Sequence, residues 1–178
     1  MTEAMRMRDP DIQEELRAWL KGASKVLVAG IGNPIRRDDH VGVRIVADLR
    51  GKVSEAVHLI ECETVPESFV DEIIGIAPSH VLLIDAALLG LSPGEARLLE
   101  PEQVTGPPAL STHSLPLKVF CEYVRKMTGA RIALLLIEPK DTGFGEGLTA
   151  EIEMSAASLG AILLRALPWA TFDARSER

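Results

Sequence analysis

Four short runs of apolar residues, separated by helical patterns, constrain the fold of this chain more than any other feature. The runs are KVLVAG (25–30), VHLIEC (57–62), HVLLIDAA (80–87) and RIALLLIEP (131–139). Each is apolar almost throughout and does not alternate with polar residues, which is typical of a strand buried on both faces of a parallel sheet. The sequence therefore predicts an α/β fold.

Helical spacing of apolar residues predicts the segments between these strands. The expected helices cover 9–22, 39–50, a segment opened by Pro66, 115–127 and about 150–167. A turn at 91–94 (LSPG) precedes EARLLE, which we expect to form a short antiparallel edge strand. The predicted architecture is a three-layer sandwich: a mostly parallel twisted sheet with one antiparallel edge strand and helices on both faces.

The length of 178 residues and the 47% hydrophobic content fit one domain with a sizeable core. We expect a single domain over 1–178. Within it, 1–24 form an N-terminal helical extension, 25–167 the α/β core and 168–178 a polar tail.

Composition excludes several classes of function. A net charge of -7 argues against nucleic-acid binding, which needs clustered Lys and Arg. Cys62 and Cys121 lie too far apart for a CxxC motif, so neither a disulfide framework nor a thiolate zinc site is expected. No apolar run has the length of a signal-peptide core or of a membrane span. We therefore expect a cytoplasmic protein without membrane insertion.

Polar residues follow the predicted strands at the edge where clefts form in α/β sheets. They are Asn33, Asp38 and Asp39 after the first strand, Glu61 and Glu63 after the second, Asp85 after the third and Glu138 after the last. His113, in the loop before a helix, can reach the same edge. Asp85 is the most informative, because a carboxylate at the end of an apolar strand is costly unless it is hydrogen-bonded, paired or bound to a metal.

Two carboxylates and one imidazole together suit a borderline divalent ion such as zinc or nickel. Ordinary structural roles compete with this interpretation. Asp85 can accept hydrogen bonds from backbone amides, one of Asp38 and Asp39 can be a helix cap, and His113 can be a surface histidine. His40 is an alternative ligand, and His58 and His80, which start strands, are expected to be structural or exposed.

Other motifs are weaker. GIGNPI resembles a dinucleotide-binding loop, but Ile35 stands at the third glycine position and the acids at 38 and 39 would repel a pyrophosphate. DTG at 141–143 precedes a predicted helix, which does not suit the pepsin-like fold. No GxSxG elbow is present, and neither cysteine has a neighbouring histidine in sequence.

Four segments, in order, resemble the [NiFe]-hydrogenase maturation endopeptidases, especially the branch serving formate-hydrogenlyase-type or related energy-converting hydrogenases. The segments are GIGNPIRRDDHVG, VLLIDAALLGLSPGEARLL, STHSLPL and IEPKDTGFGEGL. The resemblance covers about residues 25–165. Two features depart from the family's pattern: Glu138 stands where the motif commonly has Gln, and the N-terminal helix is additional.

The resemblance implies a cytoplasmic aspartyl endopeptidase with an α/β sandwich fold. It would remove the C-terminal extension of a hydrogenase large-subunit precursor after nickel insertion. The family's metal-contacting residues fall on Asp39, Asp85 and His113, and Asp39 and Asp85 are its candidate catalytic residues. Asp38 is then left as the helix cap, and His40 stands at a position that varies.

No permanent cofactor is expected, because the substrate would supply the nickel, although other divalent ions could occupy the site in vitro. The expected partner is the large-subunit precursor, with a monomer favoured. Hydrolysis could use a nickel-polarised carbonyl, a nickel-bound water or a carboxylate base. The loops at 143–147 and 101–112 are hypotheses for precursor docking. A non-catalytic nickel- or precursor-binding chaperone stays an alternative, and a dinucleotide-binding oxidoreductase a weaker one.

Overall fold

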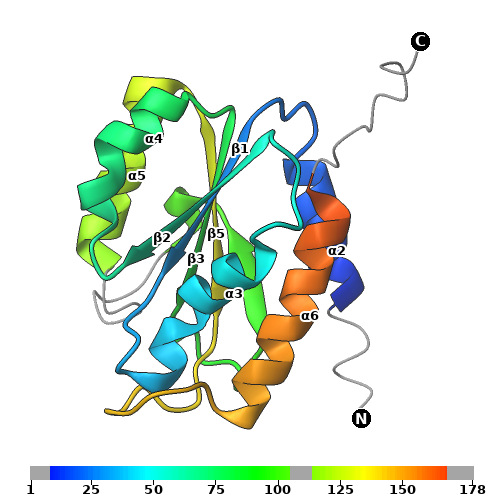
Figure 1. The fold of residues 1–178 in the computed structure, drawn as a ribbon, viewed down its shortest axis with the longest axis vertical. Helices are drawn as coiled ribbons and strands as arrows, with labels where there is room; N and C mark the ends of the chain where they lie inside the picture. Colours follow the sequence, from blue (N-terminus) through cyan, green and yellow to red (C-terminus); the bar gives the residue numbers. More distant parts are fainter. Residues whose placement is uncertain (1–8, 105–113, 168–178) are drawn as a thin grey trace.

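The computed structural model describes residues 9–104 and 114–167, which form a five-stranded sheet with helices on both faces (Figure 1). Its strand order is β2-β1-β3-β5-β4, with the bounds β1 Val26–Ile31, β2 Val57–Glu63, β3 His80–Ala86, β4 Ala96–Leu99 and β5 Arg131–Ile137. All neighbours pair in parallel except β4, which runs antiparallel to β5 at one edge. The predicted fold class and its antiparallel edge strand are confirmed.

The helices lie close to the predicted ranges. They are α2 Asp9–Trp19, α3 Val41–Leu49, α4 Val70–Ile76, α5 Ser114–Thr128 and α6 Ala150–Ala166, with short 3-10 turns η1 Arg37–His40, η2 Pro66–Phe69 and η3 Pro101–Gln103. In the described residues no helix is both long and apolar enough to cross a membrane.

Two hydrophobic cores explain why the strands read as continuous apolar runs. Side chains alternate between the faces of a sheet, and in this fold both faces are covered. Val28 and Leu82 belong to the core formed with α2, α3 and α6, whereas Leu27 and Leu83 belong to the core formed with α4 and α5. Every residue of β1 and β3 is consequently buried.

The N-terminal helix contributes to the first of these cores. Ile12, Leu16 and Trp19 lie at helical spacing and are buried, and α2 packs against α6 and β4. The extension is therefore an integral layer of the fold. The predicted polar tail at 168–178 lies outside the described residues.

The start of α3 sits directly on the carboxyl ends of two strands. A Cβ atom added to Gly42 would lie 2.1 Å from the carbonyl oxygen of Ile84 in β3 and 2.5 Å from that of Ile31 in β1. A Cβ atom on Gly30 would lie 2.4 Å from the carbonyl oxygen of Gly42. Only glycine permits this approach, and it draws the residues just before α3 onto the carboxyl edge of the sheet.

Candidate active site at the carboxyl edge of the sheet

Asp39 lies in η1, the 3-10 turn that packs against β3, and is buried. Its carboxylate Oδ2 accepts a hydrogen bond from the backbone N–H of Asn33 at 2.9 Å. Gly32 makes this fold of the loop possible, because a Cβ atom there would lie 2.1 Å from the carbonyl oxygen of Asp39. The loop after β1 therefore fixes the orientation of this carboxylate.

Asp85 is the penultimate residue of β3 and is 0% exposed. Its Oδ1 accepts a hydrogen bond from the N–H of Ala86 at 2.8 Å. Because η1 contacts β3, the structure brings the elements that carry Asp39 and Asp85 together at one edge of the sheet. Two acids that are 46 positions apart in sequence thus lie on elements that contact each other.

His113, the third predicted donor, lies outside the described residues. Within 9–104 and 114–167, no three His, Cys, Asp or Glu side chains come close enough to hold a metal ion among themselves. The combination of Asp39, Asp85 and His113 stays a prediction.

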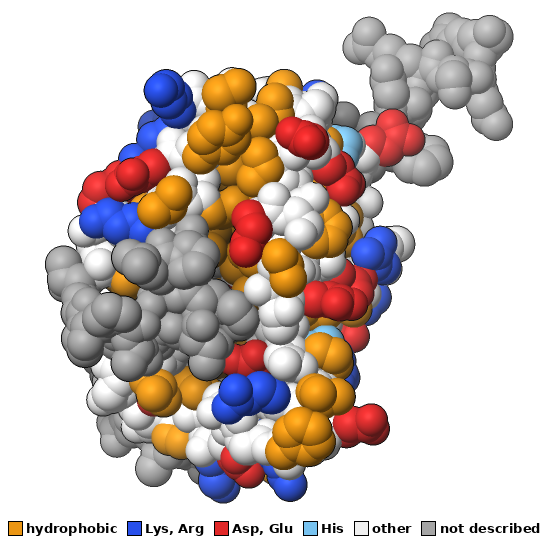
Figure 2. All heavy atoms as spheres, turned by 90° about the vertical axis from the view of Figure 1, so that its left-hand side faces the viewer, with side chains coloured by type: hydrophobic (Ala, Val, Ile, Leu, Met, Phe, Trp, Pro, Cys, Tyr) orange, Lys and Arg blue, Asp and Glu red, His pale blue; other side chains and the backbone are white. Residues whose placement is uncertain are grey.

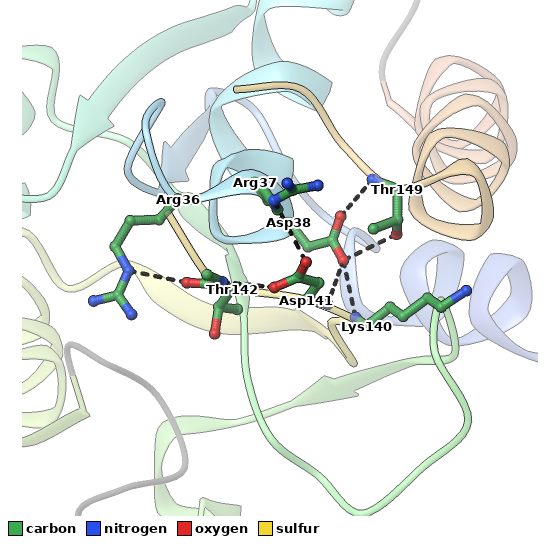
Figure 3. A network of polar contacts seen from close by, with 8 residues as sticks. Arg36, Arg37, Asp38, Lys140, Asp141, Thr142 and Thr149 are labelled. Carbon is green, nitrogen blue, oxygen red and sulfur yellow. Dashed lines mark hydrogen bonds and ion pairs between the residues drawn. The ribbon is translucent and has the colours of Figure 1, made fainter. Parts of the chain in front are cut away.

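Asp38 is not the helix cap that we expected. Arg36 occupies the N-cap position of η1 and His40 that of α3, and neither helix has a side-chain cap. The buried Asp38 carboxylate accepts hydrogen bonds from the backbone N–H groups of Lys140, Asp141 and Thr149 and from the hydroxyl of Thr149, at 2.7–3.0 Å (Figure 3). Donors on the loop after β5 and at the start of α6, not the ends of η1 or α3, satisfy this charge.

These bonds fasten the loop after β1 (33–40) to the glycine-rich loop after β5 (139–149); we call the two segments the clasped loops. Gly145 donates its N–H to the carbonyl of Ile35 at 3.0 Å and accepts from the N–H of Arg37 at 2.9 Å. The guanidinium Nε of Arg37 lies 3.4 Å from Oδ2 of Asp141 (Figure 3). Thr149 stands at the N-cap position of α6.

Glu138, which stands where the resemblance described above would place Gln, is buried, and its carboxylate is hydrogen-bonded within the protein. Its Oε2 accepts hydrogen bonds from the N–H groups of Leu89 at 2.6 Å and Leu91 at 3.2 Å. It therefore holds the loop that follows β3 and Asp85. A Gln would offer an acceptor oxygen to the same amides, so the departure preserves this contact.

His40 and His80 lie at opposite ends of the sheet. Burial lowers the pKa of His40, which is next to Asp39, although the charges of Glu61 and Asp39 act in the opposite direction. In the described residues its buried Nδ1 has no hydrogen-bond partner. His80, by contrast, is buried at the start of β3, at the opposite end of the sheet. The prediction of a structural role holds for His80.

The glycines of GIGNPI are explained without a bound phosphate. Gly30 and Gly32 stand where the backbones of Gly42 and Asp39 approach them. Two buried carboxylates, those of Asp38 and Asp39, follow in the same loop. The geometry consequently gives no support to the dinucleotide-binding alternative.

Comparison with known proteins agrees with this architecture. A family model described as hydrogenase maturation protease matches residues 43–166. A relative from Methanocaldococcus jannaschii, named as a hydrogenase maturation protease, is 33% identical over 156 residues, covering 83% of this chain and 91% of the relative. The hydrogenase 3 maturation protease of Escherichia coli is 26% identical over 123 residues, covering 69% and 78% respectively.

Among solved structures, the crystal structure of a [NiFe] hydrogenase maturation protease HycI from Thermococcus kodakarensis superposes with a TM-score of 0.80. The sequence identity is 32%, and the match covers 86% of this chain and 98% of that one. The match thus extends over almost the whole of that protein.

Proposed function

Because this chain belongs to the hydrogenase maturation protease family, we propose that it removes the C-terminal extension of a [NiFe]-hydrogenase large-subunit precursor that already holds its nickel. Membership of the family makes the chain a peptidase of hydrogenase maturation. To this family activity the proposal adds the identity of the substrate, the role of its nickel and the residues that contact the nickel. Nickel belongs to the substrate and serves as the recognition element, so that cleavage depends on metal insertion.

The observation that carries the proposal is the convergence of two buried acids on elements that touch. Asp39 in η1 and Asp85 at the end of β3 lie at the carboxyl edge, where α/β proteins bind their ligands. Carboxylates, with the imidazole of His113 as third donor, suit a borderline divalent ion that brings ligands of its own.

Two routes to hydrolysis use the same residues. In one, the carboxylate of Asp39 or Asp85 takes a proton from the attacking water. In the other, nickel in the substrate polarises the scissile carbonyl or lowers the pKa of a bound water. In both, the acids also fix the position of the scissile region relative to the metal, which lowers the entropy cost of reaction.

Burial of the acids adds a requirement. Asp39 is 2% exposed and Asp85 is 0% exposed, so an ion carried by another protein cannot reach them in this conformation. The groups that cover the two carboxylates must therefore move when the precursor binds. Because the acids are exposed only after the precursor binds, other peptides would not reach them.

The test compares nickel-loaded and nickel-free precursor by mass spectrometry. The wild-type protein should shorten only the nickel-loaded form. Asp85→Asn should keep the fold and lower the cleavage rate by at least about 100-fold, as expected for loss of a group that acts on the reacting atoms. The matched control is Asp48→Asn, an exposed aspartate of α3 that pairs with Arg44 and should leave the rate unchanged.

Normal cleavage by Asp85→Asn would remove Asp85 from the site. If the wild-type protein binds the nickel-loaded precursor but leaves its mass unchanged, the proposal is wrong and the protein acts as a non-catalytic binding chaperone. Cleavage of both precursor forms at equal rates would refute the role of nickel.

A further inference from the structure

Large hydrophobic side chains are exposed in the loop after every parallel strand. Ile35 follows β1, Val65 follows β2, Leu88 follows β3 and Phe144 follows β5; we call these four residues the apolar rim. In the described part of the chain, the other large hydrophobic residues of comparable exposure lie on α5 and α6, at 119, 123, 127 and 154. The rim therefore surrounds the edge where Asp39 and Asp85 lie.

Phe144 is the most exposed member, at 83%. An exposed aromatic ring is unremarkable on a loose loop, but this loop is fixed on both sides of the ring. Gly143 donates its N–H to Oδ1 of Asp141 at 2.7 Å, and Gly145 is bonded through both backbone groups to the loop after β1. The fold thus holds a large apolar side chain in water at a defined position.

A basic group is bonded to the loop that carries Phe144. Arg36 pairs with Gly145 in a parallel bridge, and its Nε donates to the carbonyl of Thr142 at 3.1 Å. The other two guanidinium nitrogens point away from the network in Figure 3. Figure 2, seen from the side of α4 and α5, shows hydrophobic side chains among basic and acidic ones at its lower end, where these loops lie in Figure 1.

We infer that the apolar rim, with Phe144 as its anchor and Arg36 bonded to the same loop, docks the folded body of the precursor. This inference rests on the proposed function. The matching surface on the precursor is an apolar hollow bordered by carboxylates, and it lies outside the extension that is removed. Affinity then comes from the rim, while the acids act on the nickel and the scissile bond.

Continuity with the candidate site selects this occupant. Ile35 lies four residues before Asp39 on the same clasped loop, and Phe144 lies on the loop bonded to it. A protein that brings its nickel to Asp39 must therefore cover both side chains. Because the clasped loops are already ordered, little conformational entropy is lost when the ring enters a hollow, which is the usual property of an interface anchor.

The test separates docking from chemistry. Phe144→Ala should raise KM for nickel-loaded precursor about 10- to 100-fold and leave kcat unchanged, because the ring contributes equally to the bound and reacting states. The same variant should also bind more weakly, by a similar factor, to a precursor whose C-terminal extension has been deleted. Surface plasmon resonance measures this affinity. Arg36→Ala should reduce affinity less and make it less dependent on salt.

Tyr123→Ala is the matched control, because it removes an exposed aromatic ring from α5, a helix that carries none of the rim residues. It should leave KM, kcat and binding unchanged. Thermal unfolding of both variants should match the wild type, since neither ring is buried. A lower unfolding temperature for Phe144→Ala would show that the ring supports the fold and would overturn the inference.

An unchanged KM and unchanged binding in Phe144→Ala would also overturn the inference. The proposed function would be unaffected by that result as long as the wild-type protein cleaves the precursor. Absence of cleavage by the wild-type protein would refute the proposed function instead. Binding of the extension-free precursor would then still decide whether the rim is a docking surface.

Discussion

The buried carboxylate of Asp38 accepts four hydrogen bonds, and through them this single residue joins the clasped loops. Hydrogen bonds to a charged acceptor contribute more than neutral ones, and a buried donor that loses its acceptor is costly. The position of Asp39, the next residue in the chain, thus depends on how well Asp38 is held.

We predict that Asp38→Asn lowers the free energy of unfolding by about 2–4 kcal/mol, because the new amide group directs N–H donors at backbone N–H groups. Urea denaturation measures this value. Asp48→Asn, which loses an exposed ion pair with Arg44, should change it by less than about 0.5 kcal/mol. Equal effects of the two substitutions would refute the role of Asp38.

The sequence located some of these acids and misassigned another. The position of Asp39 and Asp85 at the carboxyl edge could be predicted because they follow apolar runs, and the ends of parallel strands meet at one edge; their role in the site stays a prediction. Asp38 was expected to cap a helix, the commonest use of an aspartate before one. Its partners lie 102–111 residues away and are mostly backbone amides, which leave no pattern of residue types.

At the scale of elements, the approach of α3 to β1 and β3 determines the geometry of the site. Its first turn touches two strand ends through Gly42, where no side chain has room. Since η1 precedes α3 directly, any displacement of the helix start moves Asp39 relative to Asp85. The fold and the candidate site are therefore coupled at this glycine.

We predict that Gly42→Ala destabilises the protein by at least about 3 kcal/mol, because its methyl group would overlap two backbone carbonyls that cannot rotate away. Gly160→Ala in α6 is the matched control: its Cβ would meet nothing within 4 Å, and alanine should stabilise the helix by up to about 1 kcal/mol. Thermal and urea unfolding compare the two. If Gly42→Ala leaves the free energy of unfolding unchanged, the start of α3 can shift freely and the prediction is wrong.

Most elements could be predicted from the sequence because burial on two faces produces an apolar run that is hard to misread. The boundaries of helices were less certain. The segment opened by Pro66 begins as a 3-10 turn and its α-helix ends at Ile76, because Ala77 adopts a left-handed conformation before Pro78. Proline disfavours helical geometry in the residue before it, which accounts for the early end.

At the scale of the whole molecule, a histidine buried beside α2, at the amino end of the sheet, makes the stability of the fold depend on pH. The buried ring of His80 packs edge-on against Trp19 of α2, with ring centroids 5.0 Å apart. Burial, and then the charge of Arg131, lower the pKa of His80 below its usual value. Since the folded state resists protonation, the unfolded state takes up the proton first as the pH falls below about 6.5.

We predict that the free energy of unfolding is highest above about pH 6.5 and decreases as the pH falls towards 5.5, by at most about 1.4 kcal/mol per pH unit for each histidine involved. His40, whose pKa is also lowered, acts in the same direction. His80→Phe keeps a ring against Trp19 and should reduce this slope. Urea denaturation at several pH values measures it, and an unchanged slope would exclude His80.

The bonds of Asp38 also restrict when during synthesis the protein can become active. The amides that hold this aspartate belong to Lys140, Asp141 and Thr149, which a ribosome adds more than a hundred residues later. A nascent chain that has already formed β1, α3 and β3 still lacks these partners. Proteolytic competence therefore arrives only after residue 149 has been synthesised, and fragments that stop before this residue should be inert towards hydrogenase precursors.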